Sequence, residues 1–190
     1  MDPRVAHGII RLAWVVGILY WLVTGFGNKR TRVRGRFGSI LVYILLAGIT
    51  LAVLAASHRG LMKLLFPENI ATQLAGILIC IGGIAFAIWA RRILGRNWSG
   101  FVTVKQDHEI IQAGPYAYVR HPIYTGIIAA IAGTKLALDP TLEGLLLVIV
   151  WSGAFYLKAG YEERLLIREL GQPYMEYRRR VRWRFIPGIL

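Results

Sequence analysis

The sequence predicts an all-α, polytopic integral membrane protein with about five transmembrane helices and a cytosolic cap. The chain has 190 residues, of which 56% are hydrophobic and 17% charged, whereas soluble domains carry about 25% charged residues. The mean hydropathy is +0.51. Long uncharged runs alternate with basic clusters along the chain. One cysteine excludes a disulfide scaffold, so a single membrane-embedded domain is the class that fits.

Three long apolar runs come first, at residues 7–26, 37–57 and 71–90. Each has about the 20 residues that a helix needs to cross about 30 Å of hydrocarbon. The first run lacks a small-residue cleavage site after it, which favours a retained helix over a signal peptide. In the third run, Gly76, Gly82 and Gly83 would let another helix approach closely. We expect that helix to come from the same chain, with a second copy as the alternative.

Two shorter runs follow at residues 123–138 and 144–157, joined by Asp139-Pro140-Thr141. At 1.5 Å per residue the fourth run reaches only about 24 Å. The bilayer would thin, or Lys135 and Glu143 would snorkel to the interface, or the pair would turn back early as a helical hairpin. We expect a hairpin with snorkelling Lys135 and Glu143.

Basic residues predict the orientation of these helices. They gather in three places, after the first, third and fifth runs: Lys29, Arg30, Arg32, Arg34 and Arg36; Arg91, Arg92, Arg96, Lys105 and Arg120; Arg164, Arg168, Arg178, Arg179, Arg180, Arg182 and Arg184. The positive-inside rule places these clusters in the cytoplasm, with the N-terminus outside and the C-terminus inside. The net charge of +13 is therefore explained by membrane topology, and no nucleic-acid partner is expected.

Two polar segments, residues 91–122 and 158–190, are too long to serve only as linkers. Both are rich in aromatic and aliphatic residues, which argues against disorder. Because both lie on the cytoplasmic side of the predicted topology, we expect them to pack on each other. They would then enclose one cavity at the membrane surface, open toward lipid.

The first polar segment ends in Arg120-His121-Pro122, directly before the fourth run. Pro122 suits the first turn of a helix, and Tyr124 would then lie near His121. Gly126 leaves room for a close approach to the backbone. Charged and polar groups at this depth are costly unless they have partners, which indicates a functional site. The alternative is that Arg120 is an interfacial anchor and His121 a helix cap.

The second polar segment contains the pair Glu162-Glu163 on a continuation of the fifth helix, which Gly171-Gln172-Pro173 would end near Leu170. Neighbouring helical residues point about 100° apart, so each carboxylate needs its own partner. Glu163 would make an ordinary i,i+4 contact and Glu162 would pair with Arg168 or a loop arginine. Alternatively, one of them binds a ligand's cationic group or ribose hydroxyls.

Other functional classes lack their motifs. The sequence has no phosphate-binding loop and no nucleophile elbow. Cys80 stands alone within the third run, where packing is its expected role. None of the four histidines, His7, His58, His108 and His121, has a metal ligand at helical spacing, so no metal site is expected. The first three runs carry no ionisable residue deep inside, unlike an ion path.

A specific resemblance rests on three stretches. They are HEIIQAGPYAYVRHPIYTG at residues 108–126, EERLL at 162–166 and GQPYMEYRRRV at 171–181. Together they resemble the isoprenylcysteine carboxyl methyltransferase family, which shares a superfamily with the phospholipid N-methyltransferases. The resemblance covers roughly residues 96–187. The tail after Val181 departs from the family pattern because it is more basic.

The resemblance implies an S-adenosylmethionine site built from the cytosolic loop and the C-terminal segment, with an entry for a prenyl chain from the bilayer lipid. The residues carried over as cofactor-binding are His108, Tyr116, His121, Pro122, Tyr124, Glu162 and Glu163. Arg120 would orient the substrate carboxylate, and Arg120 and Glu163 are the expected catalytic residues. Arg182 and Arg184 are further candidates for contacting the substrate.

The expected reaction is methylation of the carboxylate of a prenylated cysteine or a similar lipidic carboxylate. One alternative is a phospholipid or small-amine N-methyltransferase, in which His121 or a glutamate would deprotonate the amine. A non-catalytic membrane protein of the same fold is the other. We expect one domain over residues 1–190, in which residues 1–69 supply two spans and residues 70–190 form the catalytic core. The sequence leaves the oligomeric state open.

Overall fold

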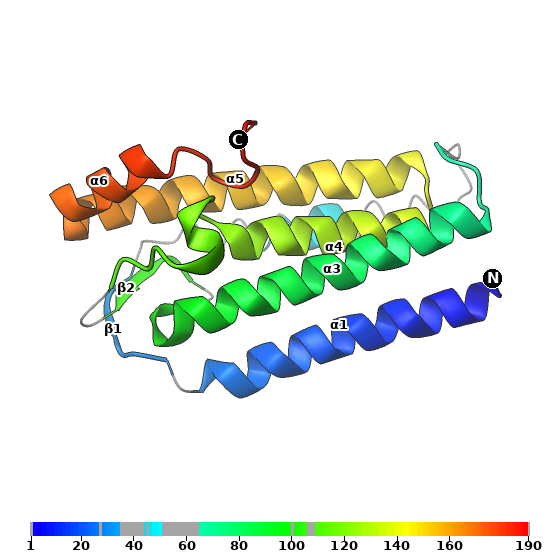
Figure 1. The fold of residues 1–190 in the computed structure, drawn as a ribbon, viewed down its shortest axis with the longest axis horizontal. Coiled ribbons are helices and arrows are strands. Elements are labelled where there is room, and N and C mark those ends of the chain that lie inside the picture. Colours follow the sequence, from blue (N-terminus) through cyan, green and yellow to red (C-terminus); the bar gives the residue numbers. More distant parts are fainter. Residues whose placement is uncertain are drawn as a thin grey trace.

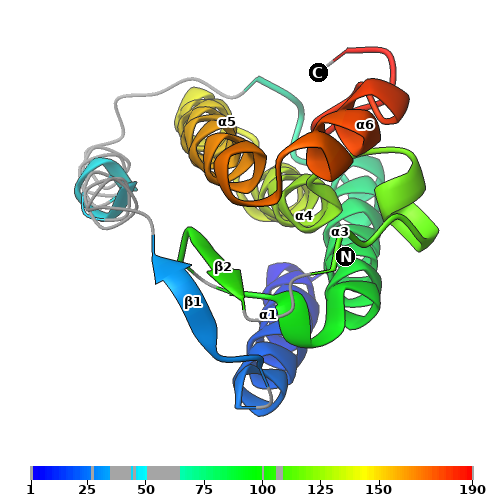
Figure 2. The same cartoon turned by 90° about the vertical axis from the view of Figure 1, so that its left-hand side faces the viewer.

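The computed structural model describes residues 2–26, 28–34, 44, 46–50, 65–99, 101–105 and 109–189. Long helices run side by side along the longest axis of the molecule (Figure 1): α1 (Pro3–Gly25), α3 (Ile70–Leu94), α4 (Pro122–Leu138) and α5 (Leu142–Leu170). Shorter elements form a cap at one end: strands β1 (Thr31–Arg34) and β2 (Thr103–Lys105), the 3-10 turns η1 (Gly95–Asn97) and η2 (Gly114–Ala117), and helix α6 (Gln172–Arg180). Seen from the cap end, α4 lies between α3 and α5 (Figure 2).

The predicted helices are confirmed wherever the structure describes them. Among the described residues, α1, α3 and α5 are each long and apolar enough to cross a membrane, and α4 is a shorter apolar helix of 17 residues. The second predicted run, residues 37–57, lies mostly outside the described residues. The number of five spans therefore stays a prediction.

Local sequence signals explain where these helices begin and end. The Asp2 side chain accepts a hydrogen bond from Arg4 N at 2.8 Å, and Asn69 and Thr72 form a reciprocal capping box at the start of α3. These caps satisfy backbone N–H groups that a first helical turn leaves unpaired. Helix α5 ends at Gly171, whose φ of 62° favours glycine.

Helices α3 and α4 are in backbone contact through glycines. A Cβ atom added at Gly83 would lie 2.6 Å from both Ala130 N and Gly126 O of α4. Gly76 faces the α4 backbone in the same way, whereas Gly82 has open space around it. The expectation that the third-run glycines serve packing within the chain is confirmed for Gly76 and Gly83. The room beside Gly126 is occupied by α3.

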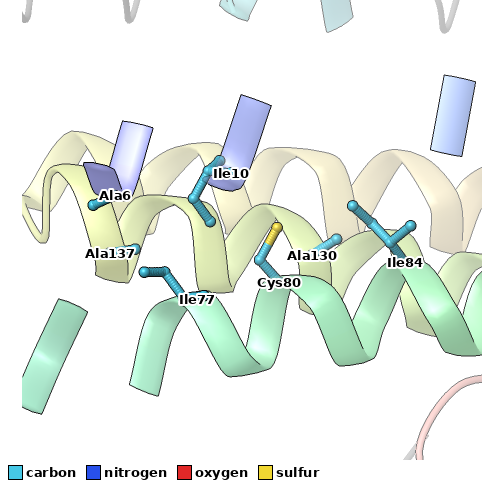
Figure 3. Packing of buried hydrophobic residues seen from close by; sticks show 7 residues of the cluster. All are labelled: Ala6, Ile10, Ile77, Cys80, Ile84, Ala130 and Ala137. Atoms are coloured by element: carbon cyan, nitrogen blue, oxygen red, sulfur yellow. The ribbon is translucent and has the colours of Figure 1, made fainter. Parts of the chain in front are cut away.

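A core of small and branched residues lies where α1, α3 and α4 meet. Figure 3 shows its buried members: Ala6, Ile10, Ile77, Cys80, Ile84, Ala130 and Ala137. Cys80 is fully buried, and its Sγ lies 3.4 Å from Thr134 Oγ1, which in turn donates to the Ala130 carbonyl oxygen. The packing role predicted for Cys80 is therefore confirmed.

The turn between α4 and α5 forms the predicted hairpin with one difference. Lys135 Nζ lies 2.8 Å from Asp139 Oδ2 at the turn. Glu143 was expected to snorkel outward, and this is wrong because the residue is only 3% exposed. It lies in the first turn of α5, where the positive end of the helix dipole stabilises a carboxylate.

The cap contains a small β-ribbon that the sequence did not indicate. Strands β1 and β2 are antiparallel, with Arg34 opposite Thr103. Val104 of β2 is fully buried in a cluster with Leu165 of α5, and Val33 of β1 packs against the same cluster. The ribbon therefore attaches the chain after α1 and after α3 to the C-terminal part of α5. Strands of three and four residues are too short to show a period-2 pattern.

Candidate functional site

A cavity lies where the cap meets the helix bundle. Its polar lining comes from Asn97, Ser99, Thr103, Glu109, Arg120, His121, Tyr124 and Glu162. Its apolar and aromatic lining comes from Leu94, Trp98, Phe101, Ile110, Ile111, Tyr116, Ile123, Leu166, Tyr174 and Tyr177. The two polar segments identified in the sequence therefore contribute to one cavity, as predicted.

The backbone at the entrance to α4 is held by the C-terminal segment. Arg120 N donates to the Trp183 carbonyl oxygen and His121 N to that of Arg184, both at 2.9 Å. His121 precedes Pro122, which is the first residue of α4. His121 is the N-cap residue, but its side chain makes no capping hydrogen bond. Its imidazole is therefore available to the side chains of α5.

Glu163 is the centre of a buried ion cluster, with a side chain that is 2% exposed. Arg120 Nε donates to its Oε1 at 2.8 Å, and Arg184 Nη2 donates to its Oε2 at 3.0 Å. His121 Nε2 lies 3.2 Å from Oε1, and Arg178 Nε lies 3.8 Å from Oε2. Because the carboxylate is surrounded by cations from three segments, it ties α4, α5 and the tail together.

Arg120 also makes main-chain contacts within this cluster. Its Nη1 donates to the carbonyl oxygens of Val181 and Arg182, at 2.7 and 2.5 Å. Two of its three guanidinium nitrogens are therefore bound to protein acceptors. Partial burial alone would lower the pKa of Arg184, but the hydrogen bonds that Arg184 donates to Glu163 raise that pKa and stabilise the charged guanidinium.

Glu162 lies in a different environment from its neighbour. Tyr124 OH is 2.8 Å from Glu162 Oε1 and 2.9 Å from Oε2. Lys158 Nζ is 3.9 Å from Oε1, and His121 Nδ1 is 3.6 Å from Oε2. The side chain is 18% exposed and lines the cavity, whereas Glu163 does not. The two carboxylates thus find separate partners, as the 100° helical offset requires.

Aromatic rings fix the position of Tyr124. Its ring stacks on His121 at a centroid distance of 5.5 Å and an interplanar angle of 1°, and on Phe155 of α5 at 4.6 Å. Phe185 of the tail makes an edge contact with both His121 and Tyr124. Such contacts restrict the two side chains that face Glu162. The expected proximity of Tyr124 to His121 is confirmed.

Buried tyrosines support the wall formed by α6. Tyr177 OH donates to the Tyr116 carbonyl oxygen at 2.9 Å. Burial raises the pKa of Tyr116, Tyr174 and Tyr177 far above the usual phenol value. These phenols therefore stay protonated at any physiological pH and serve as neutral hydrogen-bonding groups.

The predicted site residues fall into three groups. Tyr116, Arg120, His121, Tyr124 and Glu162 line the cavity. Glu163 and Arg184 form the ion cluster beside it, while Pro122 starts α4 and the side chain of Arg182 is exposed. His108 lies outside the described residues. The pairings weighed for the glutamates, Glu162 with an arginine and Glu163 with an i,i+4 neighbour, are wrong, because contacts from α4 and the tail replace them.

Four polar residues of the cavity were not predicted: Asn97, Ser99, Thr103 and Glu109. Asn97 and Ser99 follow the end of α3, and Thr103 begins β2. In the sequence these residues stand among glycines and basic residues, a composition that usually indicates a loop. A signal was the position of Asn97 within a few residues of the end of the third apolar run, on the predicted cytoplasmic side. The structure brings no group of three or more His, Cys, Asp or Glu together as a metal site within the described residues.

The neighbouring surface of the bundle carries an apolar groove between α1, α3 and α4. Its lining includes Trp14, Trp21, Ile84, Ala130 and Trp98. Trp98 lines the polar cavity as well. One half-buried ring therefore borders both spaces, and the guanidinium of Arg91 lies 4.7 Å from its centroid.

Comparisons with known proteins agree with this architecture. The model of the isoprenylcysteine carboxyl methyltransferase (ICMT) family matches residues 75–168. The chain is similar to protein-S-isoprenylcysteine O-methyltransferases of Schizosaccharomyces pombe, at 35% identity over 89 residues, and of Saccharomyces cerevisiae, at 30% over 122 residues. These alignments cover 46% and 62% of this chain but 38% and 51% of the relatives. The chain thus spans about half or less of their length.

A solved structure shares the fold. It is that of the eukaryotic intramembrane Ras methyltransferase ICMT, with a TM-score of 0.59 and 25% sequence identity, covering 77% of this chain and 52% of that one. Together with the apolar helices, this likeness identifies an integral membrane protein. Family model, relatives and solved structure agree, and this chain belongs to the isoprenylcysteine carboxyl methyltransferase family.

Proposed function

We propose that this protein is an S-adenosylmethionine-dependent methyltransferase that esterifies the carboxylate of a prenylated cysteine or a similar lipidic acid. The observation that carries the proposal is the environment of Glu162. This carboxylate lines a cavity next to His121 and Tyr124, and Trp98 lines both that cavity and an apolar groove among the membrane helices. A polar chamber beside an apolar groove suits a polar cofactor and an acceptor with a lipid tail.

The residues of the cavity fit such a cofactor. Glu162 supplies a carboxylate for an ammonium group or for ribose hydroxyls. Trp98 and Ile110 supply apolar surface for a base, and Asn97 and Ser99 are polar residues of the same lining. When bound, S-adenosylmethionine supplies an electrophilic methyl group on a sulfonium. Tyr116, His121, Tyr124 and Glu162 are the residues that we assign to its side of the cavity.

The acceptor needs positioning rather than deprotonation. A carboxylic acid is already ionised at neutral pH, so no general base has to be assigned. Holding reacting atoms about 3 to 3.5 Å apart in line is worth about 7–11 kcal/mol. Arg120 lines the cavity while Nε and Nη1 are bound to protein. Its proposed role is therefore to supply a fixed positive charge near the acceptor carboxylate and to anchor Glu163.

We also propose how the protein is oriented in the membrane and how the chain divides into a catalytic core and flanking spans. The cap that holds the cavity carries the arginine-rich α6 and tail. By the positive-inside rule this end faces the cytoplasm, and the N-terminus lies outside. Residues 70–190 would then be the catalytic core of a single domain, and residues 1–69 would contribute flanking spans.

The test compares acceptors with one purified preparation in detergent micelles. N-acetyl-S-farnesylcysteine is offered with methyl-labelled S-adenosylmethionine, beside its carboxamide and phosphatidylethanolamine. We expect base-labile methyl ester from the free acid and no product from the carboxamide. A base-stable N-methyl product from phosphatidylethanolamine would show that the acceptor is an amine lipid and not a carboxylate. Absence of both products and of saturable cofactor binding would identify a non-catalytic protein.

A further inference from the structure

The C-terminal segment carries an excess of positive charge at the protein surface. Residues 171–190 contain one acidic residue, Glu176, and five arginines: Arg178, Arg179, Arg180, Arg182 and Arg184. Two of these arginines, at positions 178 and 184, face Glu163, and Arg180 donates a hydrogen bond to Gln112. The guanidinium groups of Arg179 and Arg182 are exposed and pair with no residue in the described part of the chain. They can therefore bind an anion from outside the protein.

The same segment ends in an exposed apolar turn. Ile189 N donates to the Ile186 carbonyl oxygen at 3.1 Å across Pro187 and Gly188, and Gly188 has a φ of 86°. Proline followed by a glycine with positive φ is typical of a type II turn, whose two ends lie within about 7 Å of each other. Ile186 is 44% exposed and Ile189 is 70% exposed. An exposed apolar pair beside arginines is typical of a surface that contacts a membrane.

Helix α5 shows how deep this segment lies in the membrane. The helix has 29 residues, and about 20 of them cross the hydrocarbon. Counted from the first residue of α5, the hydrocarbon ends near Tyr161. The C-terminal tail packs against α5 on both sides of this level (Figure 1), because the Phe185 ring lies 6.4 Å from that of Tyr156 and Arg184 binds Glu163. The tail therefore lies where hydrocarbon meets headgroups, on the cap side.

Exposed aromatic side chains lie at the same level. Tyr156 and Tyr161 of α5 and Trp183 of the tail are all exposed, and tyrosine and tryptophan are enriched where a membrane meets water. The guanidinium of Arg184 lies 4.7 Å from the centroid of the Tyr156 ring. At this depth an exposed arginine is next to lipid phosphates, which its planar guanidinium can bind through two hydrogen bonds.

We propose that residues 178–189 bind anionic phospholipids of the leaflet on the cap side. Arg179 and Arg182 pair with headgroup phosphates, and the turn of Ile186 and Ile189 enters the boundary between headgroups and acyl chains. A soluble anion would leave both isoleucines in water, so the observations favour a lipid surface. Lipid binding also stabilises the fold, because the same tail supplies Arg184 to Glu163. The surface is separate from the cavity, so the inference does not depend on the proposed function.

The test follows thermal unfolding of the full chain in dodecyl maltoside micelles during titration with phosphatidylglycerol. A lipid that binds only the folded state raises the unfolding midpoint. We expect a saturable rise with phosphatidylglycerol and none with phosphatidylcholine. Each arginine near an anionic surface strengthens binding about fivefold. The double variant Arg179→Gln, Arg182→Gln should therefore need about 25 times more phosphatidylglycerol for half of the rise, which corresponds to about 1.9 kcal/mol.

A second double variant is the matched control. Arg32→Gln, Arg168→Gln removes two exposed arginines of the same cap that are already paired with Glu169. It should respond to phosphatidylglycerol like the unmodified protein. Without added lipid, Arg179→Gln, Arg182→Gln should unfold at the unmodified temperature, because neither side chain has a partner within the described residues.

The apolar turn is tested separately from the charge. The double variant Ile186→Ser, Ile189→Ser keeps every arginine and should also reduce the response to phosphatidylglycerol. Inorganic phosphate should not raise the midpoint of any variant, since it has no acyl chain for the turn to contact.

Four results would overturn the inference. The first is an unchanged response of Arg179→Gln, Arg182→Gln to phosphatidylglycerol. The second is an equal loss of response in Arg32→Gln, Arg168→Gln, which would show a general effect of cap charge. The third is an equal rise with phosphatidylcholine. The fourth is a rise with heparin as large as that with phosphatidylglycerol and insensitive to the isoleucine substitutions, which would identify a soluble anionic partner.

Discussion

Replacing Glu163 by glutamine should destabilise the fold rather than remove a group that touches the reactants. The substitution keeps the shape of the side chain and removes its charge. Arg120 and Arg184, whose side chains are 5% and 19% exposed, would then face each other without a carboxylate between them. Removing one partner of a buried ion pair costs about 3–5 kcal/mol, because the other charge stays buried and uncompensated.

The lower end of this range is expected for Glu163→Gln, since water reaches Arg184 more easily than Arg120. About 3 kcal/mol corresponds to a fall of about 6–12 °C in the unfolding midpoint of a chain of this size. Tryptophan fluorescence during heating in detergent measures that midpoint. Cofactor affinity is measured on the same preparation well below the transition, where the variant is still folded.

The neighbouring residue provides a matched control. Glu162→Gln removes the same charge from the same helix, but its partners are the Tyr124 hydroxyl and Lys158 at 3.9 Å. We expect its unfolding midpoint to fall less than that of Glu163→Gln, because Lys158 is farther away and no arginine contacts Glu162 within the described residues, and we expect its cofactor affinity to fall by tenfold or more. If Glu163→Gln instead unfolds at the original temperature and has lost cofactor binding or turnover, the division of roles between the two carboxylates is wrong.

Three further substitutions test the packing and the site. Gly83→Ala should cost up to about 3 kcal/mol because its Cβ would lie 2.6 Å from the α4 backbone, whereas Gly82→Ala, in open space, should leave the unfolding midpoint unchanged or slightly higher. Tyr124→Phe removes the hydroxyl bound to Glu162 and should weaken cofactor binding about tenfold in calorimetry, with an unchanged helical circular dichroism spectrum. Tyr177→Phe removes a buried hydrogen bond to the main chain of η2 and should lower stability by about 1 kcal/mol in chemical denaturation, and an unchanged midpoint would show that this bond is not stabilising.

Local signals explain how much of the fold was predictable. Apolar run lengths located α1, α3, α4 and α5, Pro122 marked the start of α4, and Gly171 marked the end of α5. Each of these features depends on residues within a few positions of one another. The β-ribbon pairs residues about 70 positions apart in the chain, and neither strand is long enough to carry a pattern. Such pairings depend on tertiary contacts that short-range periodicity does not encode.

The site was predictable in its members but less so in their roles. The sequence identified His121, Tyr124 and Glu162 as candidate site residues, and the structure places them together. It did not indicate that Arg184, a residue of the C-terminal tail, binds Glu163 and shields it. Asn97 was overlooked because it is buried only in the assembled cap, where it lines the cavity. Burial is a property of the assembled fold, whereas residue type and spacing are properties of the chain.

The adjacent carboxylates show how one helix can supply both an anchor and a binding group. A 100° rotation between consecutive residues directs Glu163 toward α4 and the tail, where guanidinium groups balance its charge. The same rotation directs Glu162 toward the cavity, where its shortest contacts come from the neutral hydroxyl of Tyr124. Lys158 lies farther away, at 3.9 Å, so Glu162 is less fully neutralised than Glu163 and can attract a cationic ligand. The cluster at Glu163 fixes the helix rotation, and this rotation sets the direction in which Glu162 presents its charge.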